Sequence, residues 1–216
     1  IEEPVASIGS HKMRIRFSTS NPQDMHESVL HMIAKHNNIC KHIHLPVQSG
    51  SNRILKEMNR LHTREEYMTL IEKIRVIIPN CSISQDMISG FPTETEEDHQ
   101  DTLSLMDFVK YNFGYMYSYS ERPGTLAGRK MEDDVTDETK ARRLQEIVDL
   151  QQKHAWFRSE EFIGQTVEVL VEKVSKKSTK YYSGFSKGKL QDWGFCKCEN
   201  YFLYQRNFER RSCWVE

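Results

Sequence analysis

The chain has 216 residues, of which 38% are hydrophobic and 28% charged, and its formal net charge is −1. This is an ordinary soluble composition with enough apolar residues for a real core, and the length suggests one domain plus a small second one. The near-neutral total gives no global electrostatic argument for nucleic-acid binding, and no run of residues is long and apolar enough to span a bilayer. No signal peptide is present, and the first residue is Ile1, so we expect a piece of a longer protein.

Charge and cysteine usage differ along the chain. From residue 161 onward there are ten Lys and Arg against seven Asp and Glu, whereas the preceding part carries twenty against twenty-four. A mildly basic C-terminal piece fits a nucleic-acid-binding appendage, although so small an imbalance also arises by chance. The number of cysteines is odd and their spacing suits no disulfide framework, which favours a reducing, cytoplasmic location. They are Cys40, Cys81, Cys196, Cys198 and Cys213.

The first half of the chain predicts alternating strands and helices. Residues 13–20 alternate and predict a strand, and 22–36 carry apolar residues at helical spacing. Residues 42–47 predict a second strand, and Ser51 predicts the N-cap of a helix that runs to about Met58. His42 and His44 flank one residue of that strand and share a face, so they could ligate a metal. They lack a third ligand nearby, so ordinary hydrogen-bonding histidines are the stronger interpretation.

The pattern then repeats. Thr63 followed by Glu66 is a capping box that predicts a helix over 64–78. Residues 81–89 predict a strand, the turn Gly-Phe-Pro follows, and either Thr93 or Thr95 caps a helix that starts with acidic residues. The predicted core face of the first of these helices consists of Tyr67, Leu70, Ile71, Ile74 and Ile77.

The second half begins with one more strand and a long helix. Residues 115–119 alternate, and 120–125 form a turn by composition. Residues 137–161 predict a charged helix that packs along the outside of the body. Residues 165–174 alternate clearly and start an all-β module, but the pattern is obscure after about residue 185. The predicted apolar side of the long helix consists of Leu144, Ile147, Val148, Leu150 and Gln151.

Four strands, three of them followed by a helix, predict a right-handed parallel βα series, and this could be half of an eight-stranded barrel. In such a sheet the polar groups at the strand exits converge, and here they are neutral hydrogen-bonding groups and glycines. Such a site suits a polar ligand such as a nucleoside and leaves the reaction to a cofactor. Gly50 and Gly90 would let the backbone approach that ligand, or would only form turns.

Three segments carry a resemblance. HLPVQSGSNRILKEMNR, QDMISGFPTETEEDH and YSERPGT occur in this order and closely resemble the methylthiotransferase family of radical S-adenosylmethionine enzymes. The resemblance covers residues 14–178 and is strongest to the tRNA-modifying member that acts on N6-isopentenyladenosine. It implies the C-terminal part of a radical S-adenosylmethionine barrel over 1–135, a connecting helix over 136–162, and a TRAM-like β module over 163–216 that is atypical after about residue 184.

The resemblance also implies a cofactor site. In related enzymes a Gln at a strand exit, an Arg on the following helix and an Asp on the next strand contact S-adenosylmethionine, and Gln48, Arg60 and Asp86 fall at these places. A guanidinium pairs with a carboxylate, and an Asp accepts from hydroxyls. Arg60 could instead cap its helix, and Asp86 could pair with a helix cation. The complete set of expected cofactor contacts is Gln48, Ser49, Arg60, Asp86, Ser18 and Ser20, and Arg122 is expected to face the tRNA.

One family feature is missing. The family binds its radical 4Fe–4S cluster with a Cys-x-x-x-Cys-x-x-Cys loop and a second cluster with three further cysteines, and neither set occurs here. We therefore expect the ligands of both clusters upstream of Ile1, and this chain alone to be inactive.

For the full protein the resemblance implies methylthiolation of C2 of N6-isopentenyladenosine beside the anticodon, with tRNA and a sulfur donor as partners, no membrane, and a monomeric state. The alternatives are a threonylcarbamoyladenosine tRNA or a ribosomal protein as substrate, or a non-catalytic RNA-binding remnant.

Overall fold

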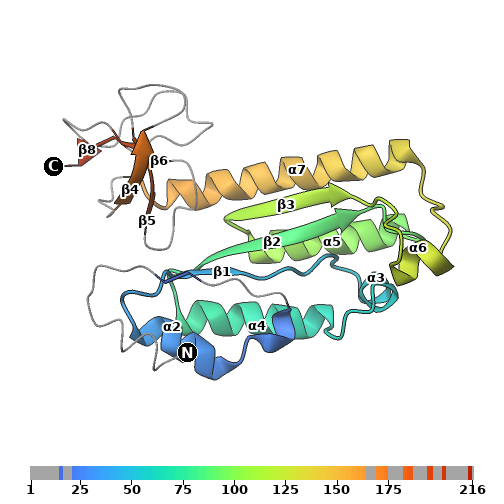
Figure 1. Cartoon of the computed structure of the whole chain (residues 1–216), viewed down its shortest axis with the longest axis horizontal. Helices are drawn as coiled ribbons and strands as arrows, with labels where there is room; N and C mark the ends of the chain where they lie inside the picture. Colours follow the sequence, from blue (N-terminus) through green and yellow to red (C-terminus); the bar gives the residue numbers. More distant parts are fainter. Residues whose placement is uncertain are drawn as a thin grey trace.

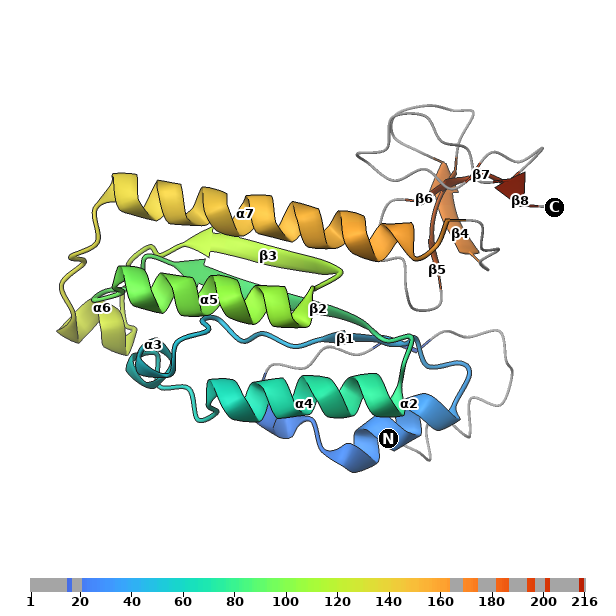
Figure 2. The same cartoon turned by 180° about the vertical axis from the view of Figure 1, so that it is seen from behind.

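The computed structural model describes residues 15–16 and 21–163, together with the backbone of five short strands beyond them. A three-stranded parallel sheet of order β1-β2-β3 forms its centre. The helices that connect and follow the strands lie alongside this sheet (Figures 1 and 2). Its elements are η1 Pro22–Asp24, α2 Glu27–Lys35, β1 His42–His44, α3 Asn52–Glu57, α4 Arg64–Ile77, β2 Ser82–Ser89, α5 Glu96–Val109, β3 Phe113–Ser118, α6 Leu126–Lys130 and α7 Asp137–Glu160.

The sheet confirms the predicted parallel βα series. In the registers of the two parallel pairs, Ile43 lies opposite Ile83 and Asp86 lies opposite Tyr115. The strand expected over 13–20 lies mostly outside the described residues, but Ile15 makes a parallel bridge to Ile39. Among the described residues, no helix combines the length and the apolarity that a membrane span requires.

Helix α4 forms as its capping signals predict. The Thr63 side chain accepts from the Glu66 N–H, and the Glu66 carboxylate accepts from the Thr63 N–H, which closes the capping box. Tyr67, Ile71 and Ile74 are fully buried, in one cluster with the apolar residues of the strands. Leu70 and Ile77 are partly buried against that cluster. The predicted core face is therefore confirmed, and burial of this stripe is the main stabilising term for the helix.

Helix α7 packs beside β3 and α5 through more polar contacts than its sequence predicts (Figure 2). Ile147 and Gln151 are buried as expected, whereas Leu144, Val148 and Leu150 are only half-buried. The buried set also includes Lys140, Arg143 and His154. Each of the three has a polar partner. Lys140 pairs with Asp133, Arg143 donates to Glu94 at 2.9 Å, and His154 contacts Asp107 at 2.9 Å. The predicted side is therefore buried only in part, and the charged residues beside it are stable there because they are paired.

The chain beyond residue 163 contains the five short strands. They are β4 Val169–Val174, β5 Tyr182–Ser186, β6 Gly194–Cys196, β7 Tyr201–Phe202 and β8 Trp214–Val215. The first three pair antiparallel in the order β4-β5-β6, and β7 pairs antiparallel with β8. Strand β4 lies in the segment for which alternation predicts the start of an all-β module. The TRAM-like identity of the module and the three domain boundaries stay predictions.

Candidate functional site

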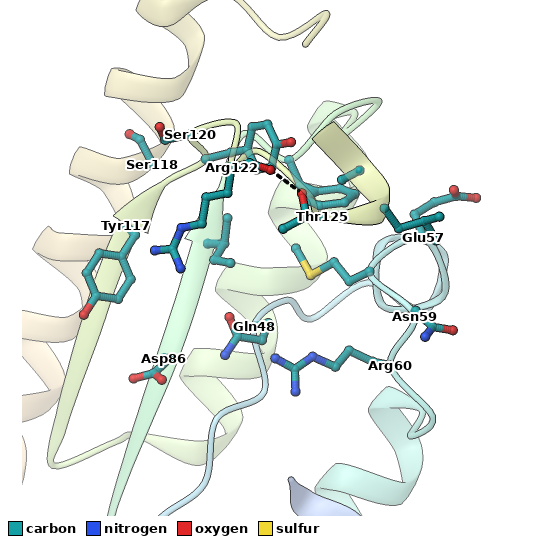
Figure 3. Close-up of a pocket in the computed structure, with 16 residues that line it drawn as sticks. Gln48, Glu57, Asn59, Arg60, Asp86, Tyr117, Ser118, Ser120, Arg122 and Thr125 are labelled. Carbon is teal, nitrogen blue, oxygen red and sulfur yellow. Dashed lines mark hydrogen bonds between the residues drawn. The ribbon is translucent and has the colours of Figure 1, made fainter. Parts of the chain in front are cut away.

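A cavity of about 620 Å³ lies where the C-terminal ends of β2 and β3 meet the loops around α3 and α6 (Figures 1 and 3). This is the edge at which parallel sheets bind ligands, and the volume is in the range of small-molecule sites. The cavity brings together four of the predicted site residues. It is lined by Gln48, Glu57, Met58, Asn59, Arg60, Asp86, Ile88, Phe91, Tyr117, Ser118, Tyr119, Ser120, Arg122, Thr125, Leu126 and Ala127.

Gln48 is held at the mouth of the sheet by backbone hydrogen bonds. Its N–H donates to the carbonyl of Asp86 at 2.9 Å, and its carbonyl accepts from the Ile88 N–H at 3.0 Å. Its φ of 74° places a non-glycine residue in the left-handed region, which costs conformational energy. Strain of this kind collects at functional sites because the surrounding fold must enforce it. In Figure 3 its amide lies between Arg60 and Asp86.

Arg60 is positioned by the end of α3. Asn59 takes a left-handed conformation with φ 55°, and its N–H donates to the Lys56 carbonyl at 2.9 Å. The Arg60 N–H donates to the Leu55 carbonyl at 2.8 Å, which completes a Schellman motif. The backbone of Arg60 thus caps the helix, while its guanidinium points toward Gln48 in the cavity (Figure 3).

The electrostatics around Arg60 leave its charge available to a ligand. Burial lowers the pKa of the guanidinium, and the nearby carboxylate of Asp86 opposes that shift. Within the described part of the chain, no carboxylate forms an ion pair with Arg60. Asp86 instead has His44 as its neighbour, with His44 Nε2 3.4 Å from Asp86 Oδ1. A half-buried cation without a partner favours an anionic ligand group, and Arg suits a carboxylate because its fork can bind both oxygens.

Arg122 enters the cavity from the turn that precedes α6. The Thr125 hydroxyl donates to the carbonyl of Arg122 at 2.8 Å and caps α6 by accepting from the Gly128 N–H at 3.1 Å. Figure 3 shows the Arg122 side chain extending from this turn toward the space beside Tyr117. The cavity is therefore lined by two guanidinium groups, and also by two carboxylates and two primary amides, which belong to Glu57, Asp86, Gln48 and Asn59.

One predicted cofactor contact, Ser49, does not line this cavity, and two others cannot be compared with it. Ser49 is fully buried, and its Oγ lies 3.4 Å from Thr102 Oγ1. The backbone N–H of Ser51 donates to the same Oγ at 3.2 Å. The structure thus gives Ser49 a packing role against α5, and its contact with a cofactor stays a prediction. Ser18 and Ser20 lie outside the described residues.

The two glycines do not approach the cavity as expected. A Cβ on Gly50 would lie 2.5 Å from the carbonyl oxygen of Asp101 on α5. At Gly90, where φ is +70°, a Cβ would lie 2.3 Å from Lys140 Cγ. Both glycines therefore allow the loops to pack against helices, and that they also admit a ligand stays a prediction.

The loop after β1 is braced by a buried carboxylate. Asp98 accepts from the Ser51 hydroxyl at 2.6 Å and pairs with Arg53, while Thr95 is the N-cap that the sequence left undecided. Burial raises the pKa of Asp98, but the hydrogen bonds from Arg53, Ser51 and Thr95 outweigh burial and hold this pKa well below its usual range. The acidic start of α5 is therefore structural, as predicted, and it fixes the loop that carries Gln48.

The sequence reasoning missed the aromatic lining. Phe91, Tyr117 and Tyr119 line the cavity, and Phe91 meets Tyr119 edge-on with ring centroids 5.2 Å apart. The alternation of tyrosines at 115, 117 and 119 was the available signal, since it places all three on one face of β3. Planar rings beside guanidinium groups suit a planar, polar ligand such as a nucleoside.

The described cysteines do not form a cluster site. Cys40 and Cys81 precede β1 and β2, at the edge of the sheet opposite the cavity. Burial raises the pKa of the Cys81 thiol to about 12, which keeps it protonated and a poor metal ligand. The sequence also contains no Cys-x-x-x-Cys-x-x-Cys loop. The residues present therefore do not fit a 4Fe–4S cluster, whereas the cavity offers groups that fit S-adenosylmethionine.

Known proteins have sequences similar to that of this chain. Residues 1–106 match the model of the Radical SAM superfamily. Over 180 residues, 83% of this chain, it is 86% identical to the tRNA-2-methylthio-N(6)-dimethylallyladenosine synthase of Flavobacterium psychrophilum and 82% identical to that of Flavobacterium johnsoniae. The same name belongs to a protein of Christiangramia forsetii that is 71% identical over 173 residues. The chain spans 37% of the length of each of the first two relatives.

Solved structures show the same fold. The coproporphyrinogen III oxidase of Escherichia coli, described as a radical SAM enzyme, superposes with a TM-score of 0.58 at 16% identity, over 86% of this chain and 50% of that one. The Elp3 protein of Methanocaldococcus infernus gives a TM-score of 0.50 at 12% identity, over 91% and 59%. Residues 1–106 of this chain, which match the family model, are therefore a segment of the Radical SAM superfamily.

Proposed function

We propose that this chain is the part of a tRNA methylthiotransferase that carries the S-adenosylmethionine pocket and the tRNA-facing turn. The full protein would add a methylthio group to C2 of N6-isopentenyladenosine beside the anticodon. The observation that carries this proposal is the 86% identity over 180 residues to a synthase of that name. The relatives at 82% and 71% identity carry the same name, which favours this substrate over a threonylcarbamoyladenosine tRNA or a ribosomal protein.

The cavity supports the cofactor assignment. S-adenosylmethionine carries a carboxylate, an ammonium group, two ribose hydroxyls and an adenine, and the cavity offers a complementary set. Arg60 would pair with the methionine carboxylate, Asp86 would accept from an ammonium or hydroxyl group, and the Gln48 amide would bond the ribose or the amino-acid part. When bound with a 4Fe–4S cluster, this cofactor supplies a radical and a methyl group. The cluster ligands would come from the part of the protein that this chain does not span.

Arg122 would face the substrate. Its turn forms the rim of the cavity, and its guanidinium can bind phosphate or stack on a base. The mildly basic residues after position 161 would add sequence-independent attraction to tRNA. In this arrangement the sheet holds the cofactor, while the turn and the C-terminal module hold the nucleic acid.

The test is analysis of tRNA nucleosides by mass spectrometry in a strain from which the whole gene has been deleted. Loss of the 2-methylthio group, with N6-isopentenyladenosine left in its place, is the expected result. Plasmid-borne wild-type protein should restore the modification, and an Arg60→Ala variant should not. Loss of a methylthio group from threonylcarbamoyladenosine or from a ribosomal protein would contradict the proposed substrate. An unchanged tRNA pool, with RNA binding by the protein, would favour the non-catalytic remnant.

A further inference from the structure

Four polar side chains form a row on the cavity side of the sheet. His42 Nε2 and His44 Nδ1 each lie 2.9 Å from the hydroxyl oxygen of Ser84. His44 Nε2 lies 3.4 Å from Asp86 Oδ1, and Asp86 lines the cavity. The register brings them together, because His44 lies opposite Ser84 in the parallel pair of β1 and β2. None of these side chains points into the apolar core, so packing does not account for their presence.

The chemistry of the groups gives the row a direction. An ionised carboxylate only accepts, so of the two tautomers of a neutral His44 ring, the one with its proton on Nε2 suits the 3.4 Å contact with Asp86. In a neutral ring the other nitrogen then accepts, so the one hydroxyl proton of Ser84 goes to His44 Nδ1. The Ser84 oxygen is left to accept from His42 Nε2–H. With both rings neutral, this arrangement, from His42 through Ser84 and His44 to Asp86, satisfies every group.

Burial favours a neutral ring at His42. Burial, with the proximity of His44 and Arg16, lowers the pKa of His42 to about 4. On the cavity side the Arg60 guanidinium lies near Asp86 without forming an ion pair with it among the described residues. The remaining neighbour of His44 is the ring of Tyr115, which meets it edge-on at 6.2 Å and is uncharged.

We propose that His44, held in one tautomer by Ser84, is a positioning residue for Asp86. Its Nε2–H would fix one carboxylate oxygen and turn the other toward the ligand. Within the described residues, Asp86 makes no other side-chain hydrogen bond or ion pair, so without His44 it could rotate away. The inference rests on the proposed function, because it takes S-adenosylmethionine as the ligand that Asp86 meets.

Two substitutions of His44 separate this role from simple packing. In His44→Gln the amide nitrogen can reach the place of Nε2 and still donate to Asp86, whereas the shorter side chain in His44→Asn reaches only the place of Nδ1. Calorimetry of the full-length protein with S-adenosylmethionine should show about tenfold weaker binding for the Asn variant and less than about threefold weakening for the Gln variant. Equal weakening by both variants, or none by either, would overturn the proposal. His31→Asn, on the exposed face of α2, is the matched control and should bind like wild type.

A second measurement does not depend on the ligand. Nitrogen NMR of the full-length protein labelled in its histidines reports which ring nitrogen carries the proton, and the signal lost in His44→Gln identifies His44. The proposal requires a neutral ring protonated on Nε2 at neutral pH, and Ser84→Ala should populate both tautomers. A ring protonated on Nδ1, or on both nitrogens, would overturn it. If wild-type protein shows the expected tautomer but binds no S-adenosylmethionine, the proposed function fails and the hydrogen-bond row stands.

Discussion

The two faces of the central sheet differ in what they contact. On β2, Ile83 and Met87 enter the apolar core together with α4 and α5, and both are almost completely buried. Ser84 and Asp86, which alternate with them, face the other way and meet histidines and the cavity. One strand thus holds the fold together with one set of side chains and presents chemistry with the other. Substitutions on the two faces should therefore affect different properties.

The largest effect on stability is expected on the core face. Ile71 on α4 is fully buried, so Ile71→Ala removes contacts and leaves a cavity, at a cost of about 2–5 kcal/mol in the free energy of unfolding. Val76 on the same helix is 79% exposed, and Val76→Ala should change that free energy by less than about 0.5 kcal/mol. Urea unfolding of both variants measures the difference. Similar losses for the two would contradict the assignment of this face as the core.

A smaller effect is expected where the sheet meets α7. Gly90→Ala places a Cβ in the left-handed region and against buried Lys140, and should cost about 1–3 kcal/mol of stability. Gly124 also has positive φ, +87°, but a Cβ there would meet no atom within 4 Å. Gly124→Ala should therefore show only the backbone strain, about 1 kcal/mol. The added substitution Lys140→Ala should recover part of the loss in the Gly90 variant. If Lys140→Ala restores no stability, backbone strain alone explains the loss in Gly90→Ala.

On the cavity face the effect should appear in binding and leave stability nearly unchanged. Arg60→Ala should weaken binding of S-adenosylmethionine about tenfold or more, because a charge-assisted hydrogen bond is lost. Lys56→Ala removes a cation from the same segment outside the cavity and should leave binding unchanged. Isothermal calorimetry and urea unfolding of both variants give the two quantities. A large loss of stability in Arg60→Ala would mean that this side chain stabilises the fold, which would contradict its assignment to cofactor binding.

The smallest effect concerns acid stability. The pKa of Asp98 is held below its usual range in the fold, so Asp98 stabilises the protein above its unfolded pKa of about 3.9 and loses this contribution as pH falls through and below that value. Glu94 acts in the opposite sense, because burial raises its pKa and protonation relieves the buried charge. Urea unfolding between neutral and acidic pH should show a shallower acid loss in Asp98→Asn than in wild type. An identical slope would contradict the role of Asp98.

The sequence predicted the elements whose local signals agree with their packing. The capping box at Thr63 and the apolar stripe of α4 gave both the ends and the buried face of that helix. The buried side of helix α7 was harder to predict, because it includes Lys140 and Arg143. Their ion-pair partners lie on other segments, and the spacing of apolar residues along α7 does not reveal them. Pairing across the fold decides which polar residues are buried, and a single sequence does not show it.

The candidate site was also predicted only in part, because contacts across the fold decide which side chains reach it. Parallel topology predicts that the strand-exit segments of Gln48 and Arg122 meet, whereas Arg60 and Asp86 were expected at the site only from the family resemblance. All four line the cavity. Ser49 fails to reach the cavity because the loop turns it toward Thr102. The link from His44 through Ser84 could not be predicted, because it depends on the register between β1 and β2.

The central claim is that the cavity at the strand ends binds S-adenosylmethionine. The most direct measurement is a crystal structure of the full-length protein with this cofactor bound. We expect the methionine carboxylate on the Arg60 guanidinium, with Gln48 and Asp86 within hydrogen-bonding distance of the cofactor. A cofactor bound elsewhere, with Arg60 free of it, would contradict the claim.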